Sequence, residues 1–235
     1  MRTVFGIGAL GFLVGTVMAS GSARGAQAIL SGSTATADTT IYLNAATDNA
    51  GGSTILFAGR NNQPSNRRAL ISFDLASIPS GATVTGVSLQ MTISNLPPSG
   101  SVTSQSLYKV SSSWVEGTGA GTGSGGTSVP GAATWNSRQD GSLAWTTAGG
   151  DFAVSPSATA SAPTSFTNVT WSGGGLVADV SAWLAAPATN FGWILIGDES
   201  TAQSIRGYNS SEAVSNAPTL TVDYTASAVG DWTAY

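Results

Sequence analysis

The sequence contains no cysteine and no histidine, and Lys109 is its single lysine. Without histidine and cysteine the chain lacks the commonest general base, the thiol nucleophile and the usual ligands of zinc. No disulfide can stabilise it either. Charged residues make up only 9% of the chain, and the formal net charge is −4. Nucleic-acid binding needs a basic footprint, so this class of protein is excluded as well.

The carboxylates also argue against catalysis. Most glycosidases need two acidic side chains on either side of the scissile bond. The acidic residues of this chain are scattered singly, apart from the neighbours Asp198 and Glu199. Adjacent residues point to opposite faces of a strand, so this pair does not make the required arrangement there. We expect no enzymatic activity.

The N-terminus has the pattern of a secretory signal peptide. Met1 and Arg2 are followed by an uncharged run from Thr3 to Ala23, and Ala26-Gln27-Ala28 supplies small residues at its end. A membrane anchor is the alternative, because the run is nearly long enough to span a bilayer. The glycines of the run and its small-residue end favour a signal peptide, residues 1–28, cleaved after Ala28. We expect a secreted, extracellular protein with no membrane span in the mature chain.

Alternating apolar and polar residues predict short β-strands over the rest of the chain. One apolar face holds Ala69, Ile71, Phe73 and Leu75, and after the turn "IPSG" a second holds Val87, Leu89, Met91 and Ile93. The segments "TTIYLN", "STILFAG", "SLYKVSS" and "TLTVDY" are further candidate strands, and "FGWILIG" is typical of a strand buried on both faces. No amphipathic helical repeat follows residue 28.

These strands predict an all-β fold, an antiparallel jelly-roll β-sandwich. The domain would cover residues 29–224 and carry a glycine-rich loop at 117–128. Residues 225–235 would form a C-terminal tail without a strong pattern.

Arginines supply the first candidate binding residues. If the sheet brings their segments together, they form a basic spot that can bind the carboxylates of an acidic sugar. The candidates are Arg60, Arg67, Arg68, Arg206 and the neighbouring Tyr208. The alternative is structural pairing of Arg68 or Arg206 with Asp74 or Glu212.

Trp145 is the candidate for stacking on a sugar ring. It lies in the loop-like segment "DGSLAWTTAGGD", and an indole offers a flat apolar face to the C–H groups of a pyranose. Packing in the core is the alternative.

Asp38, Asp48 and Asn49 are candidate ligands for a structural calcium ion, because calcium prefers oxygen donors. The alternative is that these side chains bond nearby backbone amides in turns. No other cofactor is expected.

Several separate motifs resemble one known family. They are "RALISFDLASIP" from Arg68 to Pro79 (after Arg67), "SWVEG" and "ATWNSR", and "RGYNSSE" from Arg206 to Glu212. In this order, from Ala37 to Tyr224, they resemble the DNRLRE-domain family, which is related to the disaggregatase repeat and classed as carbohydrate-binding module family 96. The resemblance implies a secreted jelly-roll module without catalysis of its own. It also implies a polysaccharide ligand, such as the acidic polymer alginate.

The leading hypothesis is therefore a secreted, non-catalytic module that binds a polysaccharide as a monomer. The alternative is an extracellular structural or adhesive protein of the cell surface or matrix, which the low charge favours.

Overall fold

The computed structural model describes residues 24–32, 36–63, 65–121, 123, 125–127 and 129–226. Residues 1–23 of the predicted signal peptide and residues 227–235 of the predicted tail lie outside this part. In chain order the elements are β1 (Arg24–Ser31), β2 (Thr36–Tyr42), η1 (Leu43–Ala45), β3 (Asp48–Asn49), β4 (Ile55–Arg60), β5 (Asn66–Phe73), β6 (Thr83–Asn95), β7 (Thr103–Lys109), β8 (Gly126–Thr127), β9 (Ser137–Gln139), β10 (Leu143–Ala144), β11 (Ala158–Ala162), β12 (Asn168–Ser172), α1 (Gly174–Ala185), η2 (Pro187–Thr189), β13 (Trp193–Ile196), β14 (Arg206–Asn209) and β15 (Thr219–Ala226).

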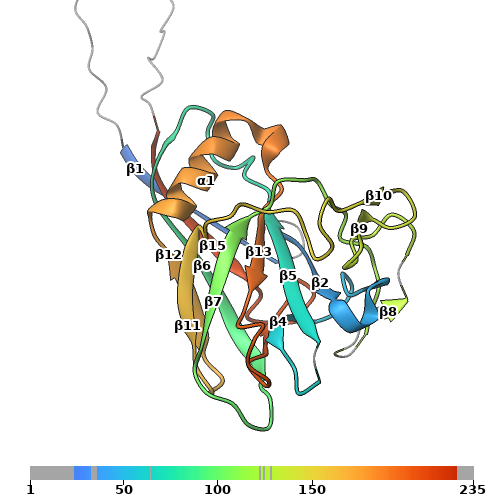
Figure 1. Ribbon diagram of the computed structural model, residues 1–235. Coiled ribbons are helices and arrows are strands. Elements are labelled where there is room, and N and C mark those ends of the chain that lie inside the picture. The colour runs from blue at the N-terminus through green and yellow to red at the C-terminus, as the bar shows by residue number, and fades with distance from the viewer. Residues whose placement is uncertain are drawn as a thin grey trace, which may run out of the picture.

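A large antiparallel sheet of eleven strands dominates the described residues and curls on itself (Figure 1). Its strands are hydrogen-bonded in the order β1-β15-β6-β14-β4-β5-β13-β7-β11, with β12 also paired to β6 and β2 to β5. Two small ribbons, β9 with β10 and β3 with β8, lie to one side of it. The all-β, antiparallel class predicted from the alternation is thus confirmed, while the jelly-roll order of strands stays a prediction.

The main core lies inside the curl. The predicted apolar faces of β5 and β6 point into it, with Ile71, Leu89 and Met91 at most 1% exposed. A smaller core lies on the other face of β5 and β13 and includes Leu70 and Ile194. Because successive side chains of a strand point to opposite faces, a strand between two cores is apolar throughout. This explains the continuous apolar run around β13.

A helix corrects the expectation of strands and loops alone. Helix α1 lies across one end of the sheet (Figure 1) and buries Leu176, Val180 and Trp183. Their spacing of four and three residues places them on one helical face. The side chain of Asp179 on the same helix accepts a hydrogen bond from Trp193 Nε1 at 2.8 Å and lies 3.6 Å from Lys109 Nζ. The helix is therefore fixed to the sheet by packing and by a polar contact.

Two strand boundaries differ from the sequence pattern. Strand β2 ends at Tyr42, two residues before the end of the candidate strand "TTIYLN", and Leu43 begins the 3-10 helix η1 with 42% of its surface exposed. Strand β1 begins at Arg24 and pairs with β15 along its whole length, from Arg24 opposite Ala226 to Ser31 opposite Thr219. The predicted cleavage site after Ala28 therefore falls inside β1. Within the described residues, no helix is both long and apolar enough to cross a membrane.

Candidate functional site

A cleft of about 730 Å³ opens beside β4, the start of β5 and the segment before β14. This volume lies within the range of about 300 to 1,000 Å³ that is usual for small-ligand sites. Its lining comes from distant parts of the chain and comprises Asn44, Ser53, Thr54, Ile55, Phe57, Asn61, Asn62, Gln63, Arg67, Asn95, Leu96, Pro97, Pro98, Gly123, Gln203 and Ile205. We call this surface the amide groove, because six of these side chains are carboxamides.

The carboxamides give the groove both donors and acceptors without a net charge. Each Asn or Gln offers two N–H donors and one carbonyl oxygen, which suits sugar hydroxyls because they also donate and accept. The Oδ1 atom of Asn61 is buried and has no hydrogen-bond partner among the described residues. Such an atom is costly unless something else satisfies it. Asn61 therefore has an unpaired acceptor oxygen buried behind the wall of the groove.

Gln203 occupies its wall of the groove in a strained backbone conformation. Its φ is 60°, in the left-handed region that non-glycine residues rarely adopt. The conformation is held by Ser99, which donates to Gln203 Oε1 from its backbone nitrogen at 3.1 Å and from its hydroxyl at 2.7 Å. Residues held in this way cluster at functional sites, so the conformation is consistent with a binding role.

Arg67 is the charged side chain among the described residues that line the groove. Its guanidinium carbon lies 5.4 Å from the centre of the Tyr42 ring and 5.2 Å from that of Phe57, within range for cation–π contact. Both rings are placed by strand pairing, since β2 and β4 lie on either side of the start of β5. The side chain is 8% exposed, and its Nε atom has no hydrogen-bond partner among the described residues.

Burial affects the ionisation of this arginine–tyrosine pair but does not neutralise the arginine. Desolvation lowers the pKa of Arg67, with Tyr42 opposing this, and the guanidinium still carries its charge at neutral pH. Burial raises the pKa of Tyr42 to about 12, so its phenol is neutral there. The wall of the groove therefore carries a fixed positive charge.

Arg68, the next residue, is committed to a structural contact. It makes a two-point salt bridge to Glu199, with Nε to Oε1 at 2.7 Å and Nη2 to Oε2 at 2.8 Å, and donates to the Gly149 carbonyl at 2.8 Å. The guanidinium also lies 4.8 Å from the centre of the Trp135 ring. Pairing of Arg68 with a carboxylate was the structural alternative, but the partner is Glu199 rather than Asp74 or Glu212.

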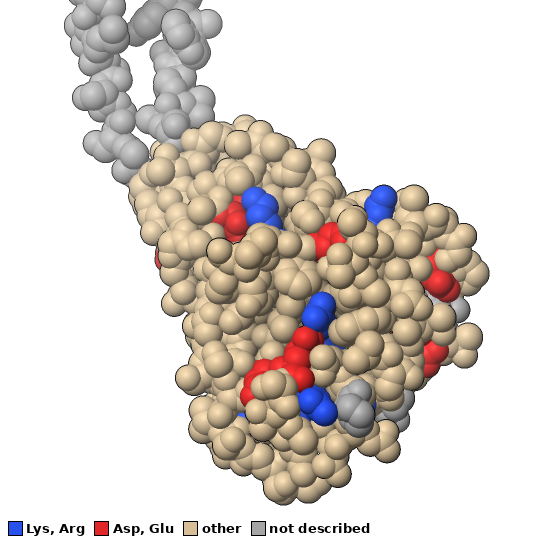
Figure 2. Space-filling view, in the orientation of Figure 1, with Lys and Arg blue, Asp and Glu red and all other residues tan. Residues whose placement is uncertain are grey.

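Arg60 lies at the end of β4, close to the amide groove but not among its lining residues. Its Nη1 atom donates to the Ser200 carbonyl at 3.1 Å, and the side chain is partly exposed. On the face drawn in Figure 2, basic and acidic side chains lie beside one another and do not gather in a basic patch. The predicted arginine cluster is thus divided between a groove, a salt bridge and a surface contact.

Arg206 and Tyr208 face inward from β14 and are both 0% exposed. The Arg206 guanidinium donates to backbone carbonyls of Pro163 at 2.7 Å, Ser101 at 2.6 Å and Ile205 at 2.9 Å. Tyr208 donates to Gln105 Oε1 at 2.9 Å, and burial raises its pKa. Neither side chain reaches the surface, and neither lines the amide groove.

Trp145 is also an interior residue. It is 4% exposed, packs in the smaller core, and donates from Nε1 to the Thr134 carbonyl at 2.8 Å. The turn-rich sequence around Trp145 is typical of a surface loop, but its ring packs into the core and holds that loop in place. The structure therefore favours the core alternative for Trp145.

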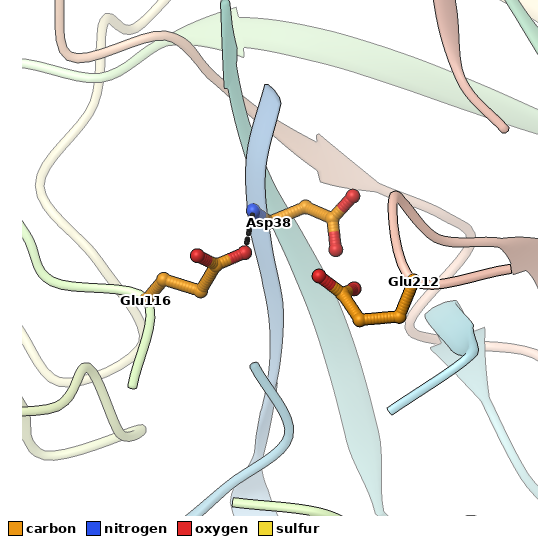
Figure 3. Close-up of side chains that lie close together, drawn as sticks. All are labelled: Asp38, Glu116 and Glu212. Atoms are coloured by element: carbon orange, nitrogen blue, oxygen red, sulfur yellow. Dashed lines mark hydrogen bonds between the residues drawn. The ribbon is translucent and has the colours of Figure 1, made fainter. Parts of the chain in front are cut away.

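The three predicted metal ligands have different surroundings. Asp38 on β2 is 0% exposed and lies beside Glu116 and Glu212 (Figure 3), which the prediction did not include. Asp48 on β3 is not part of this group. The Oδ1 atom of Asn49 accepts hydrogen bonds from the backbone nitrogens of Gly51 and Gly119, which is the turn alternative.

Asn49 also explains why glycines follow Glu116. A Cβ atom on Gly119 would lie 2.6 Å from the Asn49 carbonyl oxygen, closer than such contacts allow. Glycine therefore lets the start of the 117–128 loop pack directly on Asn49, whose Nδ2 atom donates to the Glu116 carbonyl at 2.8 Å. This packing fixes the backbone at Glu116.

The neighbouring carboxylates affect the ionisation of Asp38. Burial raises the pKa of Asp38 well above its usual range, and the nearby Glu212 and Glu116 add to the rise. Burial likewise raises the pKa of Glu116. No local sequence signal connects these residues, which are separated by more than seventy positions in each case.

Residues 30–120 match carbohydrate-binding module family 96. The match confirms the resemblance inferred from the motifs and indicates a carbohydrate-binding module in this part of the chain. It includes Asn61 and Arg67 of the amide groove, whereas Gln203 lies beyond it. No curated protein matches the chain.

Proposed function

We propose that the protein binds an acidic polysaccharide in the amide groove and does not cleave it. The observation that carries the proposal is the lining of this groove, which combines six carboxamide side chains with the guanidinium of Arg67. A ligand that both accepts and donates hydrogen bonds fits such a lining, and the family match supports a carbohydrate ligand.

The charge of the groove favours an acidic sugar. Arg67 lines it, and no aspartate or glutamate is among its described lining residues. A guanidinium binds carboxylates strongly because its planar N–H groups match their two oxygens. A uronate residue of a polymer such as alginate would place its carboxylate at Arg67 and its hydroxyls at the carboxamides.

The same composition supports binding without hydrolysis. Glycosidases of the common type hold two carboxylates beside the scissile bond. The groove offers carboxamides in their place, and a carboxamide neither donates a proton to the leaving group nor attacks the sugar.

Secretion follows from the predicted signal peptide and is open to a direct test. Intact mass of the protein recovered from the culture medium should correspond to a chain that begins at Ile29, after cleavage at Ala28. A chain that begins at Arg24 would also support secretion and would keep all of β1. Recovery of the uncleaved chain from the cells alone would contradict it.

Affinity electrophoresis tests the binding proposal. The purified protein would migrate through native gels that contain alginate, another polyuronate, or a neutral polysaccharide, at about 0.15 M salt to screen long-range charge effects. We expect the polyuronates to retard it and the neutral polymer to leave it unchanged. Without residues 1–28 the chain has six basic and twelve acidic residues, so retardation by a polyanion would not be a general charge effect.

Other results would redirect the interpretation. Retardation by the neutral polymer alone would assign the groove to neutral sugars and overturn the acidic ligand. An absence of retardation across the panel would favour the extracellular structural protein.

A further inference from the structure

Three carboxylates from distant segments meet at Asp38, Glu116 and Glu212 (Figure 3). One carboxylate oxygen from each lies within 4.8 Å of the other two. Asp38 belongs to β2, Glu116 to the segment after β7, and Glu212 to the loop after β14. The backbone nitrogen of Asp38 donates to Glu116 Oε1 at 2.7 Å, which fixes the position of that side chain. We call these residues the carboxylate cluster.

The described residues supply no positive charge to this cluster. The salt bridges of these residues join Arg68 to Glu199 and Lys109 to Asp179, and neither involves a cluster residue. Three negative charges at such separations, with Asp38 buried and the two glutamates partly buried, repel one another. Something must compensate them, either a cation or bound protons.

Two oxygens of the cluster point to a cation. Asp38 is 0% exposed, and its Oδ1 atom has no hydrogen-bond partner among the described residues, whereas Oδ2 accepts from the Ser211 backbone nitrogen at 2.8 Å. The Oε2 atom of Glu212 is likewise buried and without a partner. Figure 3 shows the carboxylates of Asp38 and Glu212 facing one another. We propose that the carboxylate cluster binds a calcium ion.

The donors and their spacing fit calcium better than other metals. Calcium takes oxygen ligands at about 2.3 to 2.6 Å, so two oxygens on one ion are at most about 5 Å apart. The cluster meets this limit. Magnesium binds at about 2.1 Å and requires tighter, octahedral geometry, and zinc prefers nitrogen and sulfur ligands that this chain lacks.

A bound calcium would join three parts of the fold at one point. The loop of Glu212 is already tied to the groove wall, because Ser210 Oγ donates to the Ser53 carbonyl at 2.6 Å and Ser53 lines the amide groove. The ion would thus hold β2, the start of the glycine-rich loop and the Ser210–Glu212 turn together. This inference does not depend on the glycan, since no cluster residue lines the groove.

Calorimetric titration of the chelator-treated, dialysed protein with CaCl₂, without any glycan, tests the proposal. We expect one calcium per chain, magnesium binding that is weaker by about tenfold or more, and a higher midpoint of thermal unfolding in calcium. Glu212→Gln and Asp38→Asn should each weaken calcium binding by about tenfold or more, because each removes a charged ligand. The matched control is Asp48→Asn, an acidic residue outside the cluster that should bind as the wild type does.

Glu212→Gln is the more informative variant, because Glu212 is only partly buried and the change preserves its shape. An absence of calcium binding by the wild-type protein would overturn the proposal and show that protons neutralise the cluster. Binding that survives both cluster substitutions, or that is lost in Asp48→Asn, would place the metal elsewhere and overturn it too.

Discussion

Arg67 and Arg206 are both buried arginines, yet their surroundings differ in one decisive respect. The guanidinium of Arg206 is surrounded by backbone carbonyls, which accept hydrogen bonds from all three of its nitrogens. The guanidinium of Arg67 lies between two aromatic rings and keeps Nε without a partner. The N–H groups of a structural arginine are satisfied by the protein, whereas those of a binding arginine are left without protein partners. The hydrogen-bond partners of the guanidinium, rather than residue type, therefore distinguish these two arginines.

The largest effect should come from removing the structural arginine. Arg206→Met keeps most of the side-chain volume but leaves several buried carbonyls without donors, and each hydrogen bond to a charged group is worth about 1.5 to 3 kcal/mol. Allowing for relaxation, we expect the free energy of unfolding to fall by about 3 to 4 kcal/mol in equilibrium urea titrations.

Arg60→Met is the matched control, because Arg60 makes one exposed side-chain hydrogen bond. It should change the unfolding free energy by about 0.5 kcal/mol or less. If Arg206→Met were as stable as this control, the contacts of Arg206 with the carbonyls of Pro163 and Ser101 would not stabilise the fold. Arg206 could then not be called a structural arginine in contrast to Arg67.

Arg67→Gln should weaken glycan binding without a comparable loss of stability. The glutamine can still make a hydrogen bond but loses the charge and the fork-shaped donor set, so we expect about a tenfold weaker affinity, equal to about 1.4 kcal/mol. The measurement is affinity electrophoresis over a series of polymer concentrations. Arg68→Gln is the control, since its side chain is engaged by Glu199. If Arg68→Gln weakened glycan binding and Arg67→Gln left it unchanged, the binding site would lie on the other face of β5.

The sequence was informative where structure depends on near neighbours. Alternation along β5 and β6 correctly predicted which of their residues enter the core. It did not reveal α1, because its apolar residues are not limited to the buried face: Val177 and Leu184 are also packed against the core, and the helix starts with glycines. A short helix of this kind is stabilised by the sheet under it more than by its own periodicity.

The site could be predicted only in part, because it depends on which segments the fold brings together. Arg67 and Arg68 are adjacent and identical in type, and only the pairing of β5 with its neighbours separates their roles. Glu116 and Glu212 gave no metal signal, since their relation to Asp38 exists only after the sheet has formed. Composition indicates the available chemistry, but non-local packing decides where it is used.

The Arg68–Glu199 salt bridge should contribute less to stability than the carbonyl contacts of Arg206 do. Its free energy should also be smaller than the contribution of Arg67 to glycan binding. Its side chains are 16% and 21% exposed, so water partly screens the two-point contact. A double-mutant cycle with Arg68→Gln and Glu199→Gln should give a coupling free energy of about 1 kcal/mol, measured by urea unfolding. The coupling should fall at high salt. Coupling near zero would show that stacking on Trp135, rather than charge, fixes Arg68.

The smallest effect concerns the turn that leads into Gln203, on the wall of the groove. Asp198 Oδ1 accepts hydrogen bonds from the hydroxyl of Ser200 at 2.6 Å and from the backbone nitrogens of Ser200 and Thr201 at 2.8 and 3.1 Å, and these lower its pKa. A carboxyl whose pKa is lower in the folded state stabilises the fold above its unfolded pKa of about 3.9 and loses this contribution as the pH falls. We therefore expect stability to decrease from about pH 4 downward in urea titrations.

Asp198→Asn isolates this contribution, because it removes the titration and keeps the side-chain shape. The variant should be slightly less stable than the wild type near neutral pH and should lose less stability below about pH 4. The pH dependence of stability that remains in this variant would include a contribution from Asp151. The pKa of Asp151 is lowered because hydrogen bonds from Thr146, Thr147 and Ser112 outweigh the effect of its burial. Since the turn positions Gln203, glycan binding by Asp198→Asn should also weaken slightly, by about twofold. If the loss of stability in acid were the same in Asp198→Asn as in the wild type, the Asp198 turn would open without cost to the fold. Gln203 would then be held by Ser99 and by the backbone carbonyl of Asn61.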